Sequence, residues 1–113
     1  MVYDTARMLA AQLKASEEYK TYLMAREEAF QNETTKALIA EYQRLQVKLQ
    51  ATMLSGGSNE EMMQKLQKLG ELLQFDDKAS RFLIAEYRIK TMLGDVYKIL
   101  AEAVDVDLSM LEQ

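Results

Sequence analysis

The chain has 113 residues, of which 49% are hydrophobic and 28% charged, and its net charge is −4. That length suits one domain, and this balance of apolar and charged residues is typical of a globular chain rather than a disordered one. Cysteine and histidine are both absent, which excludes disulfides, thiolate nucleophiles, zinc or iron–sulfur ligation through sulfur, and imidazole acid–base catalysis. We therefore predict a protein that is not an enzyme and has no cofactor, metal or small-molecule substrate.

The helix-forming character of the chain is strong. Proline is absent and glycine occurs only four times, which favours long helices. No apolar run approaches the roughly 20 residues that span a bilayer. The first residues also lack the basic and then hydrophobic order of a secretory signal. We expect an all-α cytoplasmic protein, without membrane insertion, that forms a single helical domain over residues 1–113.

Two short helices are predicted at the start of the chain. The first carries an apolar stripe with 4-3-4 spacing, formed by Val2, Ala6, Leu9 and Leu13. Ser16 indicates the N-cap of a second helix, because two glutamates follow it at the positive end of the helix dipole. The second helix presents Tyr19, Tyr22, Leu23, Ala29 and Phe30, and ends near residues 31–32.

A third helix is predicted from a cap at Asn32 to about Leu54. Its apolar stripe consists of Thr35, Leu38, Tyr42, Leu45, Leu49 and Thr52, broadened by Ile39 and Met53. Because residues 32–35 form a weak break, the second and third helices could instead be one bent rod.

The strongest break is the turn at residues 55–58, Ser-Gly-Gly-Ser. Ser58 and Glu61 have the spacing of a capping box for a fourth helix, whose stripe consists of Met62, Leu66, Leu69 and Leu73. Residues 75–77 then offer a cap for a long fifth helix to about Val104. We predict an antiparallel helical bundle or hairpin of about five helices with a long C-terminal helix, followed by a short acidic tail at residues 105–113.

The fifth helix has the most regular apolar pattern, with 4-3 spacing throughout: Phe75, Ala79, Phe82, Glu86, Ile89, Leu93, Val96, Leu100 and Ala103. A sustained 3.5-residue period is typical of a coiled-coil-like seam. We call the central part the interaction seam, formed by Phe82, Glu86, Ile89, Leu93, Val96 and Leu100. A narrow helix pair cannot bury both of its sides alone. We therefore expect a homo-oligomer, a dimer or higher, and a protein partner.

Glu86 is the one charged residue inside this seam. A carboxylate in a seam costs several kcal/mol unless it is paired or hydrogen-bonded. One interpretation is that an Arg or Tyr of another helix or subunit pairs with Glu86, which would then select a partner. The other is that Glu86 lies at the hydrated edge of the seam.

A second candidate site is a basic patch on one flank of the same helix, formed by Lys78, Arg81 and Arg88. Such a patch can bind RNA phosphates or an acidic partner, but it is also what a solvated helix face looks like. No aromatic platform lies between its members, which weakens the case for RNA. Direct RNA binding is therefore an alternative that we do not favour, and a purely structural, self-assembling protein is another.

The pentapeptide Leu-Ile-Ala-Glu-Tyr at residues 38–42 recurs at residues 83–87. Duplicated helical hairpins would produce such a repeat. The flanking residues do not match, so chance explains it equally well.

Three stretches, taken in order, resemble the YlbF/YmcA/YheA family of small helical bacterial proteins. They are residues 3–10 leading to residues 16–19, residues 38–42 with Gln46 and Gln50, and residues 82–87 followed by residues 92–96. The resemblance covers nearly the whole chain. It implies an all-helical, oligomerising, non-enzymatic protein.

The resemblance also implies a setting, because better-studied relatives act in a complex that supports competence, sporulation and biofilm formation. They do so by modulating mRNA processing through a membrane-tethered endoribonuclease. Some relatives carry a cysteine-bearing region associated with an iron–sulfur cluster. This chain has no cysteine, so the cluster is not expected here.

Overall fold

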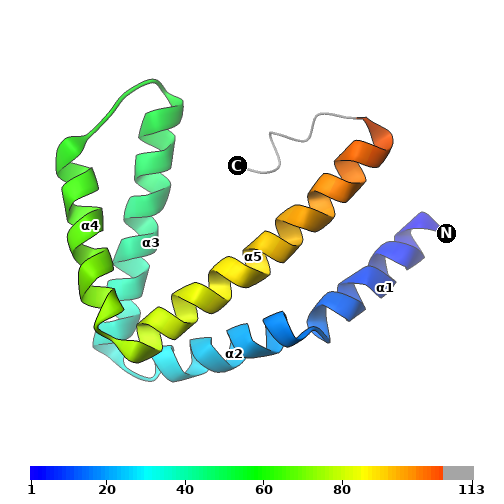
Figure 1. The fold of residues 1–113 in the computed structure, drawn as a ribbon, viewed down its shortest axis with the longest axis horizontal. Helices are drawn as coiled ribbons and strands as arrows, with labels where there is room; N and C mark the ends of the chain where they lie inside the picture. The colour runs from blue at the N-terminus through cyan, green and yellow to red at the C-terminus, as the bar shows by residue number, and fades with distance from the viewer. Residues whose placement is uncertain (106–113) are drawn as a thin grey trace. The chain divides into compact units, whose positions relative to one another are not determined.

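The computed structural model describes residues 1–105, and within them it contains five helices (Figure 1). They are α1 (Val2–Lys14), α2 (Glu17–Phe30), α3 (Glu33–Leu54), α4 (Glu60–Gln74) and α5 (Asp77–Val104). The predicted all-α class and the long C-terminal helix are confirmed. The alternative of one bent rod is wrong, because α2 and α3 are separate helices. The predicted acidic tail lies outside the described residues, apart from Asp105.

Side-chain caps begin all four helices that follow α1, and three of these caps stand where the sequence predicts them. Ser16 Oγ accepts a hydrogen bond from the backbone N–H of Tyr19 at 3.2 Å, and Asn32 Oδ1 accepts one from Thr35 at 3.0 Å. Asp76 Oδ1 accepts from the backbone N–H groups of Lys78 and Ala79. These bonds satisfy amide groups that have no partner inside the helix. The caps predicted at Ser16, Asn32 and residues 75–77 are therefore confirmed.

The remaining cap differs from the prediction. Helix α4 begins one residue later than the Ser58 capping box requires, so Asn59 is its N-cap and Asn59 Oδ1 accepts from Met62 N–H at 3.0 Å. Ser58 is therefore not the cap. The turn before it is as predicted, since Gly56 has a φ of +85°, a conformation that glycine adopts without steric cost.

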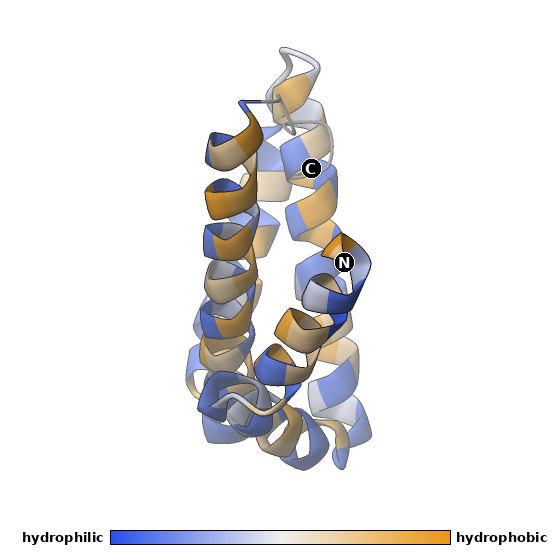
Figure 2. Cartoon of the chain, turned by 90° about the vertical axis from the view of Figure 1, so that its right-hand side faces the viewer, coloured by the Kyte–Doolittle hydropathy of each residue, from blue (hydrophilic) through white to orange (hydrophobic). Residues whose placement is uncertain are grey.

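The helices fall into two compact units. Among the described residues, unit 1 contains residues 1–22 and 84–105, and unit 2 contains Leu23–Leu83. Helices α2 and α5 each contribute to both. Hydrophobic and hydrophilic residues alternate along the helices, as expected when one face of each helix packs and the other meets water (Figure 2). The single domain over residues 1–113 stays a prediction.

Unit 2 is built on the α3–α4 hairpin, in which the two helices lie side by side (Figure 1). Its buried residues are Ala29, Thr35, Ile39, Leu45, Leu73, Ala79 and Phe82. The predicted stripes of α3 and α4 are buried or half-buried, whereas Met53 is 62% exposed and does not broaden the stripe. A Cβ added to Gly70 would lie 3.4 Å from the Tyr42 ring, so α4 approaches α3 closely at this point.

The base of unit 2 joins the end of α2 to the start of α5. The rings of Phe30 and Phe82 lie 5.3 Å apart at a tilt of 54°, an arrangement that aromatic pairs favour. Arg26 and Lys36 each lie over the Phe30 ring, within cation–π distance. The contact with Phe30 helps to bury Phe82 in the second turn of α5, where Arg81 beside it stays exposed.

Unit 1 contains α1, the first turns of α2 and most of α5. No residue of α1 is buried, and Val2 is 79% exposed, so the predicted stripe of the first helix packs only through the half-buried Leu9 and Leu13. Ala85 and Ile89 of α5 are buried. Helix α5 ends at Val104, and Asp105 follows with a φ of 51°.

Candidate interaction surfaces

The 4-3 pattern of α5 divides into a buried part and an exposed part. Phe82 is 2% exposed and Ile89 is 8% exposed, whereas Leu93 is 40% and Leu100 is 50% exposed. Phe75 is 90% exposed and lies before α5, because α4 ends there and Asp76 starts a new helix. The 4-3 pattern therefore does not extend to Phe75. The seam as an interaction surface stays a prediction.

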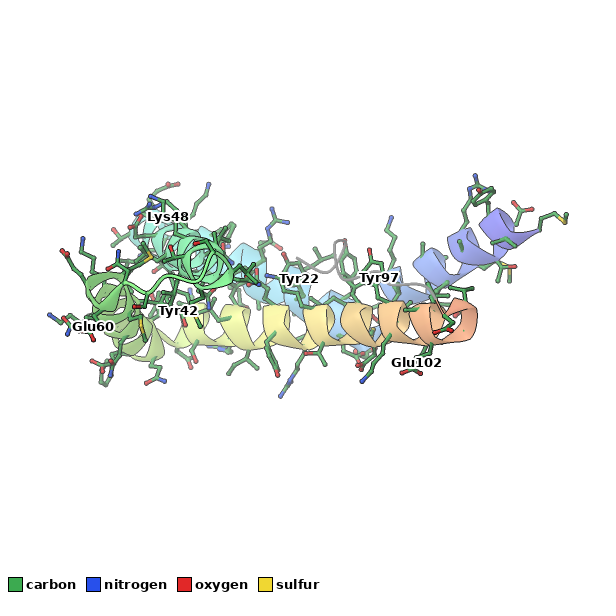
Figure 3. All side chains as sticks on the ribbon, turned by 90° about the horizontal axis from the view of Figure 1, so that it is seen from above. Tyr22, Tyr42, Lys48, Glu60, Tyr97 and Glu102 are labelled. Atoms are coloured by element: carbon green, nitrogen blue, oxygen red, sulfur yellow. The ribbon has the colours of Figure 1, made fainter. Side chains whose placement is uncertain are left out.

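The exposed part forms one surface of unit 1, which we call the distal α5 face: Leu93, Tyr97, Leu100 and Val104. At 3.6 residues per turn these four positions share one side of the helix. Their exposed fractions rise along α5, from 40% at Leu93 to 63% at Val104. Tyr97 and Glu102 project from opposite sides of α5, so the carboxylate of Glu102 does not lie on the distal α5 face (Figure 3).

Glu86 lies within the buried part of this pattern, between Phe82 and Ile89. Its side chain is 15% exposed, and its Oε1 lies 3.4 Å from Lys90 Nζ in the next turn of the same helix. Lys90 is thus one partner of Glu86, at a spacing that stabilises helices. The Arg or Tyr of another helix or subunit stays a prediction.

The predicted basic patch is distributed over both units and mixed with acidic groups. Lys78 and Arg81 belong to unit 2, where Arg81 forms ion pairs with Asp77 and with Glu28. Arg88 belongs to unit 1, where it lines a groove of about 340 Å³ together with Glu18 and Asp95. Carboxylates therefore offset the charges of Arg81 and Arg88, and the case for a phosphate-binding stripe is weaker than the sequence suggested.

The α3–α4 hairpin carries two grooves that the sequence analysis missed. One is an apolar groove of about 560 Å³, lined by Gln46, Leu49, Gln50, Met53, Leu54 and Leu66. The other, which we call the basic cleft, has a volume of about 250 Å³ and is lined by Arg44, Leu45, Lys48, Asn59, Glu61, Met62 and Lys65. Helical spacing alone places Arg44 beside Lys48, but it does not reveal that Lys65 joins them from α4.

No helix within residues 1–105 combines the length and the apolar character that crossing a membrane requires.

The family, the relatives and the solved structures to which this chain is similar each match more than nine tenths of it. The family model Com_YlbF, described as control of competence regulator ComK, YlbF/YmcA, matches residues 2–105. A UPF0342 protein of Symbiobacterium thermophilum is 42% identical over 108 residues, covering 95% of this chain and 96% of that protein. A UPF0342 protein of Desulfitobacterium hafniense is 35% identical over 104 residues, covering 91% of this chain and 84% of that protein.

Two solved structures share the fold. A protein of unknown function (DUF964) from Bacillus stearothermophilus has a TM-score of 0.76 and 22% identity, covering 92% of each chain. Bacillus subtilis RicA, solved in complex with RicF, has a TM-score of 0.60 and 20% identity, covering 92% of this chain and 93% of that chain.

Proposed function

We propose that this chain, which belongs to the Com_YlbF family, is a non-catalytic regulatory protein that acts by binding a protein partner through its distal α5 face. The description of the family names the control of a competence regulator and names no chemical reaction. A protein of this kind changes the behaviour of its partner by occupying a surface, so it needs a recognition face and no reactive groups.

The observation that carries the proposal is the exposure of the distal α5 face. Four large apolar or aromatic side chains, between 40% and 63% exposed, continue the spacing of a stripe that is buried further back in the same helix. Burying such side chains is worth roughly 25 cal/mol for each Å² removed from water. A contiguous apolar surface of this kind is typical of a protein-binding site.

The 3.5-residue period indicates the kind of partner. A helix whose own apolar residues repeat at this spacing would pack side chains of Leu93, Leu100 and Val104 into its grooves. Tyr97 suits the same surface, because its ring packs while its hydroxyl finds a polar group at the rim. A relative of the same fold, RicA, was solved in complex with a protein, RicF. That complex supports a protein partner for this chain too.

The regulated process is a finer part of the proposal. The family resemblance supports a role in modulating an mRNA-processing endoribonuclease. The partner of the distal α5 face would then be a protein of that machinery, and the chain itself would make no contact with RNA.

Two alternatives lead to different measurements. Direct RNA binding through Lys78, Arg81 and Arg88 is disfavoured because Arg81 already pairs with two carboxylates. A purely structural protein would use the distal α5 face to bind a second copy of itself, which is consistent with the predicted homo-oligomer. Sedimentation of the purified chain separates self-assembly from binding to another protein.

The proposal is tested with a matched pair of substitutions in α5. Leu100→Glu places a charge on the distal α5 face, and Ile99→Glu places the same charge one residue away, on another side of the helix, where Ile99 is 66% exposed. Affinity purification from the native cell with quantitative mass spectrometry compares both with the wild type. We expect Leu100→Glu to lose the partner by about tenfold or more, which corresponds to about 1.4 kcal/mol, and Ile99→Glu to retain it. Equal recovery with both variants would exclude the distal α5 face as the recognition surface.

A further inference from the structure

The basic cleft of the α3–α4 hairpin brings together charges from two helices. Arg44 and Lys48 lie one turn apart on α3, and Lys65 comes from α4. One carboxylate, that of Glu61, also lines the cleft, so the lining carries three positive charges and one negative charge. The cleft lies within unit 2, and Lys48 is labelled on its α3 side in Figure 3.

Arg44 is already held in place by a neighbouring carboxylate. Its Nε donates to Glu41 Oε2 at 2.9 Å, and its Nη2 donates to Glu41 Oε1. This two-point contact orients the guanidinium plane. Lys48 and Lys65, by contrast, form no ion pair with any group in residues 1–105, so both ammonium groups are available to a ligand.

Glu41 lies beside Arg44 and within range of the charges of Lys48 and Lys65. Its hydrogen bond from Arg44, followed by the charges of Arg44, Lys48 and Lys65, lowers the pKa of Glu41 below its ordinary value. The ionised form of a carboxylate is thus favoured at the edge of the cleft. A second carboxylate brought between Lys48 and Lys65 would be attracted by the charges of these two lysines, whereas the hydrogen bonds of Arg44 are already used by Glu41.

The floor and the end of the cleft add further recognition elements. Leu45 is buried and Met62 is half-buried, so both offer apolar contacts to a side chain that enters. The Oδ1 atom of Asn59 is used by Met62 N–H, which leaves the amide N–H₂ of this lining residue as a donor. A volume of about 250 Å³ is smaller than the roughly 300–1,000 Å³ of most small-molecule sites, and it suits individual side chains of a peptide.

We propose that the basic cleft binds an acidic segment of a partner protein, with the carboxylates of the segment between Lys48 and Lys65 and an apolar side chain on Leu45 and Met62. Charge complementarity identifies this occupant. A nucleic acid fits less well, because the lining contains no aromatic residue for base stacking and the chain has a net charge of −4. The inference is independent of the distal α5 face, which belongs to unit 1.

The test uses the full chain and a fluorescein-labelled peptide of six glutamates and two leucines, measured by fluorescence anisotropy at low ionic strength. The test variant is Lys48→Glu with Lys65→Glu. The matched control is Lys20→Glu with Lys68→Glu, which has the same net charge and changes two exposed lysines outside the cleft. We expect the affinity for the peptide to fall about tenfold or more in the test variant, because each charge reversal removes an attraction and adds a repulsion. In the control the affinity should fall less than about threefold, because exposed charges away from the binding site contribute little.

Four further measurements make the outcome decisive. A peptide with glutamine in place of glutamate should not bind the wild type, and a peptide with lysine in place of glutamate should bind the test variant better than the wild type. Leu100→Glu should bind the acidic peptide as the wild type does, so a failure here and a failure of the distal α5 face are distinguishable. Circular dichroism melting verifies that each variant folds. If the double charge reversal prevents folding, the variant Lys48→Gln with Lys65→Gln replaces it as the test variant.

Equal losses in the test and control variants, or no loss in either, would overturn the proposal. An oligouridine of six phosphates that binds more tightly than the peptide, with the same dependence on Lys48 and Lys65, would also overturn it and assign the cleft to nucleic acid.

Discussion

Thr35 and Asp76 lie 41 residues apart in the chain and are joined by a hydrogen bond of 2.6 Å from Thr35 Oγ1 to Asp76 Oδ2. The other carboxylate oxygen, Oδ1, caps α5 through the N–H groups of Lys78 and Ala79. One side chain therefore starts α5 and ties it to the first turn of α3. This places the start of α5 against the hairpin in unit 2.

Substitution of Thr35 should show how much this bond contributes to stability. Thr35 is 6% exposed, and Thr35→Val fills the same space without the hydroxyl donor. We expect the free energy of unfolding to fall by about 1–2 kcal/mol, because the carboxylate of Asp76 loses a short hydrogen bond. Denaturant unfolding measures the change. Thr35→Ser keeps the hydroxyl and should retain more of the stability, and a loss as large as that of Thr35→Val would contradict this role.

The same pair predicts a dependence of stability on pH. The hydrogen bond from Thr35, followed by the one from the Ala79 N–H, lowers the pKa of Asp76 below its ordinary value. In the unfolded chain Asp76 has its ordinary pKa, so on acidification the unfolded state takes up the proton first. The stability that Asp76 contributes is therefore present above its unfolded pKa and is lost as the pH falls through its lower folded pKa.

Asp76→Asn isolates this contribution from that of other carboxylates. The difference in unfolding free energy between wild type and Asp76→Asn should be largest near neutral pH and should shrink in acid. Urea unfolding at a series of pH values measures that difference. A difference that stays constant down to the acid range would mean that the folded environment does not favour the ionised form of Asp76.

Phe82 and Phe75 form a matched pair for the core of unit 2. Phe82 is 2% exposed and contacts Phe30, whereas Phe75 is 90% exposed. Phe82→Ala should cost about 3–5 kcal/mol through lost burial and the cavity left behind. Phe75→Ala should change stability by less than about 0.5 kcal/mol. Thermal unfolding of the two variants should differ plainly, and similar melting temperatures would show that Phe75 is covered in solution.

Gly70 and Gly94 occupy helix interiors, where glycine is less favourable than alanine. A Cβ at Gly94 meets no atom within 4 Å, and one at Gly70 makes van der Waals contact with the Tyr42 ring at 3.4 Å. Both Gly94→Ala and Gly70→Ala should therefore raise the unfolding free energy, each by about 0.5–1 kcal/mol. Gly70→Leu should lower it, because the larger side chain displaces Tyr42. Destabilisation by Gly70→Ala would mean that α3 and α4 pack more tightly than the 3.4 Å contact indicates.

Residues that act within one or two turns of the chain were enough to predict the helices of this protein. The caps at Ser16 and Asn32 and the glycine turn at residues 55–58 act within a few residues, so they are visible in the sequence. The error at Ser58 is of the same local kind, because Asn59 is an equally good cap one residue later. Lys65 was missed because its place beside Lys48 depends on the register of α4 against α3.

The repeated pentapeptide shows most clearly which features depend on the local sequence and which depend on tertiary packing. Residues 38–42 and 83–87 have the same sequence and are both helical, as their composition predicts. Yet Ile39 is 1% exposed and Ile84 is 50% exposed, whereas Ala85 is buried and Ala40 is exposed. Helix formation depends on backbone hydrogen bonds and side-chain propensities within about one turn, which are identical in the two segments. The buried side of each helix depends on the neighbouring helices, and these differ. The surfaces that stay open for partners therefore follow from tertiary packing and not from the local sequence.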